Sequence, residues 1–397
     1  MKKQIRFHLS LVAVLALAAA PVLHAQIAPG ELVAPKIEIS GGNLNFTIQP
    51  SMVGRNYWLQ DSDTMAGGTW ADVGVVRSGD GGNLVISIPY APEVQRRFFR
   101  VALVEAPPAP AGFSLISAGS FTMGDQSSPL VGYPDELPVH GVLVSAFYLQ
   151  KHEVSKALWD EVRNWGLTHG YTDLAEGSML ETTNFSKGAA HPVHSITWYD
   201  MVKWCNARTE YDNATKETTL TACYRVSGAV YKTGQSDAVV CNWSANGYRL
   251  PTEAEWEKAA RGGLSARNFP WGDTISHSQA NYYSSSSDSY DVSTTRGYHP
   301  TYNTGDAPYT SPVGSFAPNG YGLYDMAGNV FEWCWDGYGT YPSTPQTDPR
   351  GDAGGNRVLR GGSWNGGAAN ARCAFRAYTA PGNADYFSGF RPARGAP

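Results

Sequence analysis

Glycine and proline dominate this chain to a degree that limits how it can fold. They contribute 43 and 25 of the 397 residues, which is above average usage. Aromatic residues make up 12 % of the sequence and charged residues only 16 %. Helical bundles and coiled coils need many more charged residues, and disordered chains contain few aromatic ones. The composition therefore predicts a folded protein rich in β-strands, turns and ordered loops.

The charge balance argues against two classes of partner. The formal net charge is −5, with 30 basic and 35 acidic residues. Nucleic acids and anionic lipid surfaces are bound through clustered positive charge, and no such cluster follows the N-terminus. After the N-terminal segment no stretch is apolar enough to span a bilayer. We therefore expect no nucleic-acid partner and no membrane span.

The N-terminal segment has the three parts of a secretory signal peptide. Lys2, Lys3 and Arg6 precede an apolar run at 9–20, and Ala25 offers a small residue for cleavage. Such a run is too short and wrongly flanked for a stable membrane span. Residues 1–25 are predicted to be a signal peptide, and the mature protein is expected in the periplasm or outside the cell. A buried N-terminal helix is the alternative.

Two domains are expected after the signal peptide. Residues 33–104 resemble a small β-sandwich-like module, because apolar and polar residues alternate in several short runs. The runs lie at 36–39, 44–48, 84–88 and 97–101. A linker with three prolines follows at 105–112, and this composition is typical of a semi-rigid spacer. The second domain is expected to cover residues 113–394.

Three helices can be placed in the second domain from their capping residues. Ser155 is a good N-cap for a helix running to about residue 165. Thr197 with Asp200, and Thr252 with Glu255, each have the spacing of a capping box. The remainder is dense in Gly, Asn, Asp, Trp and Tyr, which suits short strands and long loops.

The second domain resembles the formylglycine-generating enzyme family, also called sulfatase-modifying factor domains, from about residue 113 to residue 391. The resemblance implies an α+β, C-type-lectin-like fold with little regular structure. The most specific segment is YRLPTEAEWE at 248–257. The others, in the expected order, are GSFTMG at 119–124, KHEVS at 151–155, FPWGD at 269–273, NGYGLYDMAGNVFEW at 319–333, RGGSW at 360–364 and GFR at 389–391.

The residues that carry the family's chemistry are largely missing. Active members oxidise a cysteine of a sulfatase peptide to formylglycine, using oxygen and a copper ion held by two cysteines. Gly366 stands in place of the first, and nothing within 365–372 matches the second. Cys373 matches a structural cysteine, Ser363 matches a serine beside the active site, and Phe331 replaces a tryptophan. Cu(I) selects soft thiolate ligands, so we predict no copper and no copper-dependent oxidase; a divergent oxidoreductase acting on a sulfatase cysteine is an alternative.

Calcium is the cofactor that the resemblance supports. At the first site Asp325 and Glu332 would supply carboxylates, and Gly328 and Val330 would supply backbone carbonyls. A second site would use Asn281, the Tyr282 carbonyl and Asp306, although the spacing after Asp306 drifts from the family pattern. Hard oxygen ligands are what calcium requires. The alternative is that these carboxylates only accept hydrogen bonds from the loop backbone.

Five cysteines remain, Cys205, Cys223, Cys241, Cys334 and Cys373, and an exported chain tends to pair them. We predict a disulfide between Cys223 and Cys241, which flank a turn-rich segment. A pair of Cys334 and Cys373 is the second candidate, since both lie in segments that carry the family resemblance. Cys205 would then be unpaired. No CxxC spacing occurs, which disfavours a structural zinc site.

Three kinds of function fit these observations. The chain is expected to be an exported sulfatase-modifying-factor protein without copper chemistry, enzymatic or degenerate. It could instead be a lectin-like display protein, since its last segment resembles the ligand-binding end of hypervariable lectin-like proteins. A structural or assembly role in the envelope is the third possibility. Ser363, Trp364, Asn365 and Tyr386 are the candidate binding residues for a protein, peptide or glycan ligand, and no catalytic residue can be named.

Overall fold

The structure is a computed structural model. In it the chain forms two compact units. The first comprises Met1–Ala109 with Ser117–Gly119, and the second comprises Pro110–Ile116 with Ser120–Pro397. The described residues are 11–15, 24–25, 36–41, 43–49, 55–62, 71–78, 83–89, 97–105, 109–127, 130–180, 183–184, 187–351 and 354–396. Most of the predicted signal peptide and the centre of the predicted linker lie outside these residues.

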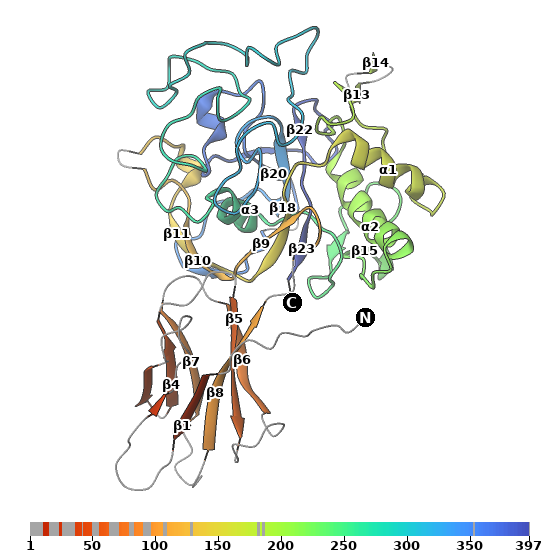
Figure 1. The fold of residues 1–397 in the computed structure, drawn as a ribbon. Coiled ribbons are helices and arrows are strands. Elements are labelled where there is room, and N and C mark those ends of the chain that lie inside the picture. Colours follow the sequence, from red (N-terminus) through yellow and green to blue (C-terminus); the bar gives the residue numbers. More distant parts are fainter. Residues whose placement is uncertain are drawn as a thin grey trace, which may run out of the picture. The chain divides into compact units, whose positions relative to one another are not determined.

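The first unit contains two β-sheets (Figure 1). Their strand orders are β2-β1-β8-β5-β6 and β3-β4-β7. The strands are β1 (Leu11–Leu15), β2 (His24–Ala25), β3 (Lys36–Ser40), β4 (Asn43–Ile48), β5 (Arg55–Ser62), β6 (Ala71–Ser78), β7 (Leu84–Pro89) and β8 (Arg97–Glu105). The four strands predicted from alternating residues are confirmed as β3, β4, β7 and β8.

A small apolar core accompanies the second of these sheets. Alternate residues of β4 are buried, as a strand with one covered face requires. They pack with Ile86 and Ile88 of β7, and Tyr57 of β5 joins the same cluster.

Part of the segment expected to be the apolar part of a signal peptide forms a strand. Residues 11–15 are β1, which pairs antiparallel with 97–101 of β8. Cleavage after residue 25 would therefore remove β1 and β2 from this sheet and leave β8 as an edge strand.

The three predicted helices of the second unit are confirmed with their caps. They are α1 (Lys156–Leu167), α2 (Trp198–Thr215) and α3 (Glu253–Ala260). The Ser155 hydroxyl accepts a hydrogen bond from the Leu158 amide, and Thr197 and Thr252 form capping boxes with Asp200 and Glu255. Among the described residues, none of the helices has both the length and the hydropathy needed to cross a membrane.

Short strands and long loops make up the rest of the second unit. The strands are β9 (Phe113–Ile116), β10 (Gly119–Met123), β11 (His140–Val144), β12 (Phe147–Gln150), β13 (Met179–Leu180), β14 (Thr183–Asn184), β15 (Tyr224–Val226), β16 (Ala229–Val230), β17 (Val240–Cys241), β18 (Phe331–Gly337), β19 (Gln346–Thr347), β20 (Arg357–Arg360), β21 (Ala377–Thr379), β22 (Ser388–Gly389) and β23 (Ala393–Gly395). Two short 3-10 helices cover Pro134–Glu136 and Ala368–Ala371. This mixture of small sheets and few helices fits the predicted α+β class.

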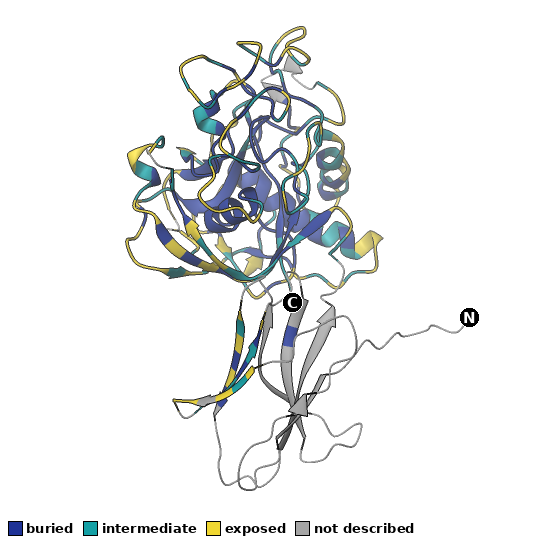
Figure 2. Ribbon diagram, turned by 60° about the vertical axis from the view of Figure 1, so that its left-hand side comes forward, coloured by how far each residue is buried: buried dark blue, intermediate teal, exposed yellow. Residues whose placement is uncertain are grey.

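The core of the second unit lies around α3 and the sheet of order β21-β20-β18-β22. Every residue of α3 is buried, including three glutamates, and Figure 2 shows the buried residues concentrated in this central region. Buried carboxylates need ionic or hydrogen-bonded partners. Arg261 and Arg360 supply them for Glu257, so polar as well as apolar contacts hold this helix in place.

Candidate functional site

Three segments that are distant in the sequence meet at the start of β18. The amide of Asn329 donates to the carbonyl of Asn281 at 2.8 Å, and the amide of Trp364 donates to the carbonyl of Asn329 at 2.8 Å. Gly328 has φ +81°, and a Cβ atom at this position would lie 2.2 Å from the Asn281 carbonyl oxygen. Only glycine allows so close an approach of two backbones. The predicted site residues are therefore on one tightly packed framework.

Trp364 is the centre of an aromatic cluster on this framework. Its ring lies 5.6 Å from Tyr298, 5.3 Å from Tyr309 and 5.9 Å from Tyr386, measured between ring centroids. Tyr283 extends the cluster by packing edge-on against Tyr298 at 5.0 Å. We call Tyr283, Tyr298, Tyr309, Trp364 and Tyr386 the aromatic cluster. Such spacings are those of favourable ring pairs.

The cluster combines a buried floor with accessible edges. Trp364 is buried, whereas the side chain of Tyr283 is 41 % exposed and the other three tyrosines are half-buried. The indole nitrogen of Trp364 is buried without a hydrogen-bond partner. Asn365 is exposed and accepts a hydrogen bond from the buried Ser363 hydroxyl at 2.7 Å. The structure thus brings together the four binding residues predicted from sequence.

The segment at 365–372, where the copper ligands of the family would lie, contains no pair of thiols. The amide of Gly366, which stands where the family's first copper ligand would be, donates to the carbonyl of Ser363. Cys334 and Cys373 belong to the apolar core. Burial raises the pKa of the Cys334 thiol well above its usual range and that of Cys373 to about 12. Both groups are therefore neutral thiols at neutral pH, which bind copper poorly.

All five cysteines are free thiols in this structure. Even so, the Cys223 and Cys241 thiols form a hydrogen bond with each other, which lowers the pKa of Cys223, assisted by the nearby Arg249 cation. They come together because Cys241 pairs with Tyr224 in the ladder of β15 and β17. The predicted disulfide is not formed here and stays a prediction. Cys205, expected to be unpaired, is fully buried in α2.

Asp325 has the properties expected of a cation ligand. One carboxylate oxygen accepts a hydrogen bond from the Gly314 amide at 2.5 Å, and the other is buried without a partner. Burial raises the pKa of this carboxyl to about 6, and the Glu332 charge adds to the shift. A buried carboxylate oxygen without a donor is costly, and a bound cation would satisfy it.

Glu332, the second predicted carboxylate ligand, already has partners. Arg391 donates to both of its oxygens at 2.7 Å, and the Trp256 indole donates to one of them at 2.8 Å. The structure therefore assigns Glu332 to an ion pair within the protein. As arranged here, its side chain does not fit the role of a free metal ligand.

A third carboxylate, that of Glu153, lies next to these two. It accepts hydrogen bonds from the Asn329 side chain at 2.6 Å and from the Val330 amide at 3.3 Å. Burial raises the pKa of Glu153 well above its usual range, and the charges of Asp325 and Glu332 raise it further. Three buried carboxyl groups thus interact electrostatically with the guanidinium of Arg391, which forms its ion pair with Glu332. The excess of negative charge favours either a bound cation or protonation.

The calcium hypothesis stays a prediction. In the described part of the chain, no three His, Cys, Asp or Glu side chains are grouped to hold a metal ion. Because Glu332 is held in its ion pair, the predicted first set of calcium ligands is reduced to the Asp325 carboxylate and the backbone carbonyls of Gly328 and Val330.

The residues of the predicted second calcium set lie in different environments. Asn281 is buried and its amide group donates to the Tyr309 carbonyl at 2.8 Å, which leaves its side-chain oxygen buried without a partner. The Tyr282 carbonyl contacts the His277 ring at 3.1 Å. Asp306 is exposed. Of this second set, we take only the side-chain oxygen of Asn281 as a buried, unpartnered group that a bound cation would satisfy.

Comparison with known proteins decides the family. A family model described as the sulfatase-modifying factor enzyme 1-like domain matches residues 101–396. The chain belongs to this family. Formylglycine-generating enzyme from Bos taurus is 34 % identical over 302 residues, which cover 72 % of this chain and 75 % of that protein. Serine/threonine-protein kinase pkn1 from Chlamydia pneumoniae is 33 % identical over 298 residues, 70 % of this chain but 37 % of that protein.

The solved structures include Treponema denticola variable protein 1. It is similar with a TM-score of 0.53 at 28 % identity, over 71 % of this chain and 94 % of that one. The predicted family is therefore confirmed. The relatives carry names as different as enzyme, kinase and variable protein. Membership of the sulfatase-modifying factor family thus establishes the fold of the second unit but not a reaction.

Several residues of the site were not predicted from sequence. Tyr283, Tyr298 and Tyr309 come from a long loop, and only the density of tyrosine between 282 and 309 hinted at them. Glu153 lies in the KHEVS segment, and its place beside Asp325 depends on contacts across more than 170 positions.

Proposed function

We propose that this protein is an exported member of the sulfatase-modifying factor family that binds a peptide or glycan through its aromatic cluster and performs no copper-dependent oxidation. The observation that carries the proposal is the segment after Ser363. It places Trp364 among four tyrosines and contains no thiol up to residue 372.

The chemistry of the cluster supports ligand binding. Tyrosine and tryptophan offer large, rigid contact areas with polar edges at a low cost in conformational entropy, and asparagine offers adaptable hydrogen bonds. The exposed Asn365 and Tyr283 and the half-buried Tyr386 fit this description. The likeness to a structure named as a variable protein favours the display hypothesis over a purely structural role.

The competing oxidase hypothesis lacks ligands for its metal. Copper chemistry of this family needs two convergent thiolates. The nearest cysteine in sequence is Cys373, which is buried with a raised pKa. The test is incubation of the purified protein with a cysteine-containing sulfatase-motif peptide, copper and a reductant, followed by mass spectrometry. We expect no aldehyde product; turnover with stoichiometric Cu(I) binding would overturn this part of the proposal.

Binding is tested on arrays of bacterial surface glycans and of random peptides. We expect hits with the wild type and a loss of at least about tenfold in affinity for Tyr386→Ala, because truncating an aromatic hot-spot residue costs about 2 kcal/mol or more. Tyr378→Ala is the matched control, since Tyr378 is 52 % exposed and lies outside the aromatic cluster. Equal losses in both variants, or no hit on either array, would contradict the proposal.

We also propose that the region of Asp325 holds a structural calcium ion, to which the carbonyls of Gly328 and Val330 would contribute further oxygen ligands. The support is the buried, unpartnered oxygen of Asp325 and the excess of buried carboxyl groups. When bound, the ion would neutralise the excess negative charge of these buried carboxyl groups.

Export of the protein would be tested separately by fractionation and N-terminal sequencing, with a mature start at Gln26 as the expected result.

A further inference from the structure

A cavity of about 290 Å³ lies where α3 begins and β18 ends, and none of its lining residues belongs to the aromatic cluster. Its walls come from β11, α3, β18, the loop at 339–342 and the segment at 349–351. A space of this size suits a ligand of a few carbon atoms, since pockets for drug-sized molecules begin near 300 Å³.

Buried polar groups line this cavity. Glu253, Asp336, Arg376, His140 and Tyr341 are all among its lining residues, and each is less than a tenth exposed. Such a concentration of buried polar side chains is costly unless each finds a partner. The state of the two carboxyl groups therefore decides what the cavity can accept.

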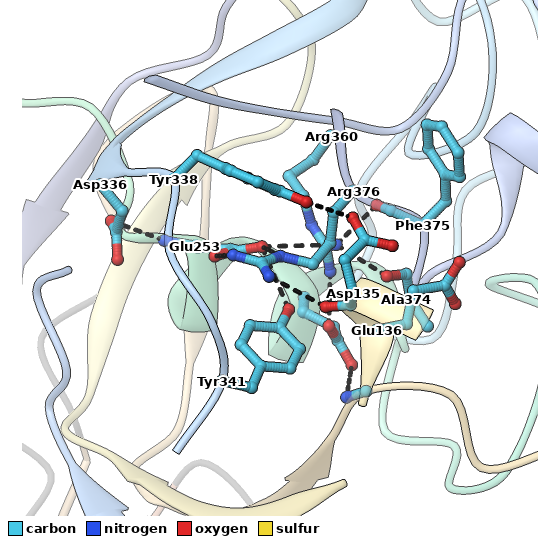
Figure 3. A network of polar contacts seen from close by, with 12 residues as sticks. Asp135, Glu136, Glu253, Asp336, Tyr338, Tyr341, Arg360, Ala374, Phe375 and Arg376 are labelled. Atoms are coloured by element: carbon cyan, nitrogen blue, oxygen red, sulfur yellow. Dashed lines mark hydrogen bonds and ion pairs between the residues drawn. The ribbon is translucent and has the colours of Figure 1, made fainter. Parts of the chain in front are cut away.

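The charge of Glu253 is fully matched within the protein. Arg376 donates to both of its carboxylate oxygens, at 2.6 and 2.9 Å, and the Tyr341 hydroxyl donates to one at 3.1 Å. Figure 3 shows this arrangement, with the Arg376 guanidinium directed at Glu253. The same guanidinium donates to the carbonyls of Asp135 and Gly339, so it has little capacity left for a ligand.

Asp336 has no such partner. One of its carboxylate oxygens accepts a hydrogen bond from the Glu253 amide at 2.9 Å, and in Figure 3 this bond alone links Asp336 to the network. Arg357 interacts with Asp336 electrostatically, but its guanidinium donates to the Trp335 carbonyl at 2.8 Å. Burial raises the pKa of Asp336 well above its usual range, and the charge of Glu253 raises it further.

We propose that the cavity binds an alkylammonium group, whose positive charge takes the place of the Asp336 proton: the carboxyl group releases this proton to the solvent and forms an ion pair with the ammonium. A cation is favoured over an anion because Glu253 and Arg376 neutralise each other, which leaves the acidic Asp336 carboxyl group to set the charge preference of the cavity. Arg350 is the other arginine in the wall; it is exposed, and its guanidinium carbon lies 4.6 Å from the centre of the Trp243 ring. The proposed ligand is either a small free amine or the lysine side chain of another protein.

The experiment is calorimetric titration of the full-length protein with n-butylamine, with 1-butanol as the uncharged match. We expect saturable binding of the amine and none of the alcohol. N-acetyl-lysine methylamide distinguishes the two sources: binding at least as tight as that of butylamine indicates a protein lysine, and weaker binding indicates a free amine. Absence of saturable binding by both amines, or equal binding of butanol, overturns the proposal.

Variants test the role of the carboxyl group. Asp336→Asn is expected to weaken butylamine binding at least tenfold while circular dichroism remains unchanged. Thr340→Arg, at an exposed position in the cavity wall, is expected to weaken it similarly by placing a fixed cation there, whereas Thr340→Ser is expected to bind as the wild type does. Should Asp336→Asn not fold, the threonine pair decides the outcome. Undiminished binding in folded Asp336→Asn, or in Thr340→Arg, overturns the proposal.

Discussion

Arg391 donates to both carboxylate oxygens of Glu332, from Nε and Nη2 at 2.7 Å each. Both side chains are buried. This ion pair joins the GFR segment near the C-terminus to β18, and the Arg391 guanidinium also donates to the carbonyls of Lys151 and Tyr324. One side chain thus ties together three parts of the site.

Replacing Arg391 by Met is expected to destabilise the protein by about 3–5 kcal/mol, because it leaves Glu332 buried without its counter-charge. Denaturant unfolding measures the change. Arg267→Gln is the control, because its pair with Asp273 is half exposed and such pairs contribute about 1 kcal/mol or less. Similar losses of unfolding free energy in the two variants would show that the buried ion pair contributes no more to stability than the exposed one.

The calcium-free protein is expected to lose stability as the pH rises through about 6. The pKa of Asp325 is raised by burial from 3.8 to about 6, so the folded state holds this proton more tightly than the unfolded state. The resulting stabilisation is full below pH 3.8 and is lost above pH 6, a difference of about 3 kcal/mol at 1.36 kcal/mol per pKa unit. Asp325→Asn should flatten this dependence in chelator-treated protein. An unchanged pH profile would contradict the assignment.

Calcium is expected to raise the melting temperature at pH 8. An ion that binds only the folded state stabilises it by mass action. Thermal melting with and without a chelator measures the effect, and Asp325→Asn should respond less than the wild type. Asp306→Asn serves as the control at the exposed position, and we expect its response to match the wild type. No shift in the wild type would exclude the calcium site and leave protonation as the explanation for the buried carboxyl groups.

Oxidation is expected to join Cys223 to Cys241, because their thiols are in contact and the pKa of Cys223 is lowered by that contact and by Arg249. The closed loop would contribute roughly 3 kcal/mol. Titration of thiols in denatured protein should find five in the reduced form and three after mild oxidation. In Cys223→Ser four should remain, whereas Cys373→Ser should still form the bond. Five titratable thiols after oxidation of the wild type would refute the pairing.

Gly328→Ala is expected to destabilise the second unit by more than 2 kcal/mol. The new Cβ atom would lie 2.2 Å from the Asn281 carbonyl oxygen, and the residue has φ +81°. Gly297→Ala is the matched control: its φ is +88°, but nothing lies within 4 Å of the added atom, so only the backbone term of about 1 kcal/mol applies. Equal losses of stability in the two variants would mean that the backbone adjusts to the close contact between the new Cβ atom and Asn281 without an energetic cost.

The sequence alone determined the features that depend on neighbouring residues. Ser155, Thr197 and Thr252 each marked a helix start, because capping involves residues three positions apart. Alternating residues marked β3 and β4 for the same reason. The lack of thiols between Ser363 and Cys373 was likewise visible in the sequence. It was the basis for predicting no copper-dependent oxidase.

Only the tertiary structure decided which side chains meet. Glu332 was predicted as a metal ligand, but its partner Arg391 lies 59 positions away and no local pattern links the two. The tyrosines around Trp364 and the cavity beside Asp336 likewise arise from loops that the fold brings together. The physical reason is that charge compensation and burial depend on all neighbours in space. An isolated motif lists possible donors and acceptors, whereas the folded chain determines which of them are already paired.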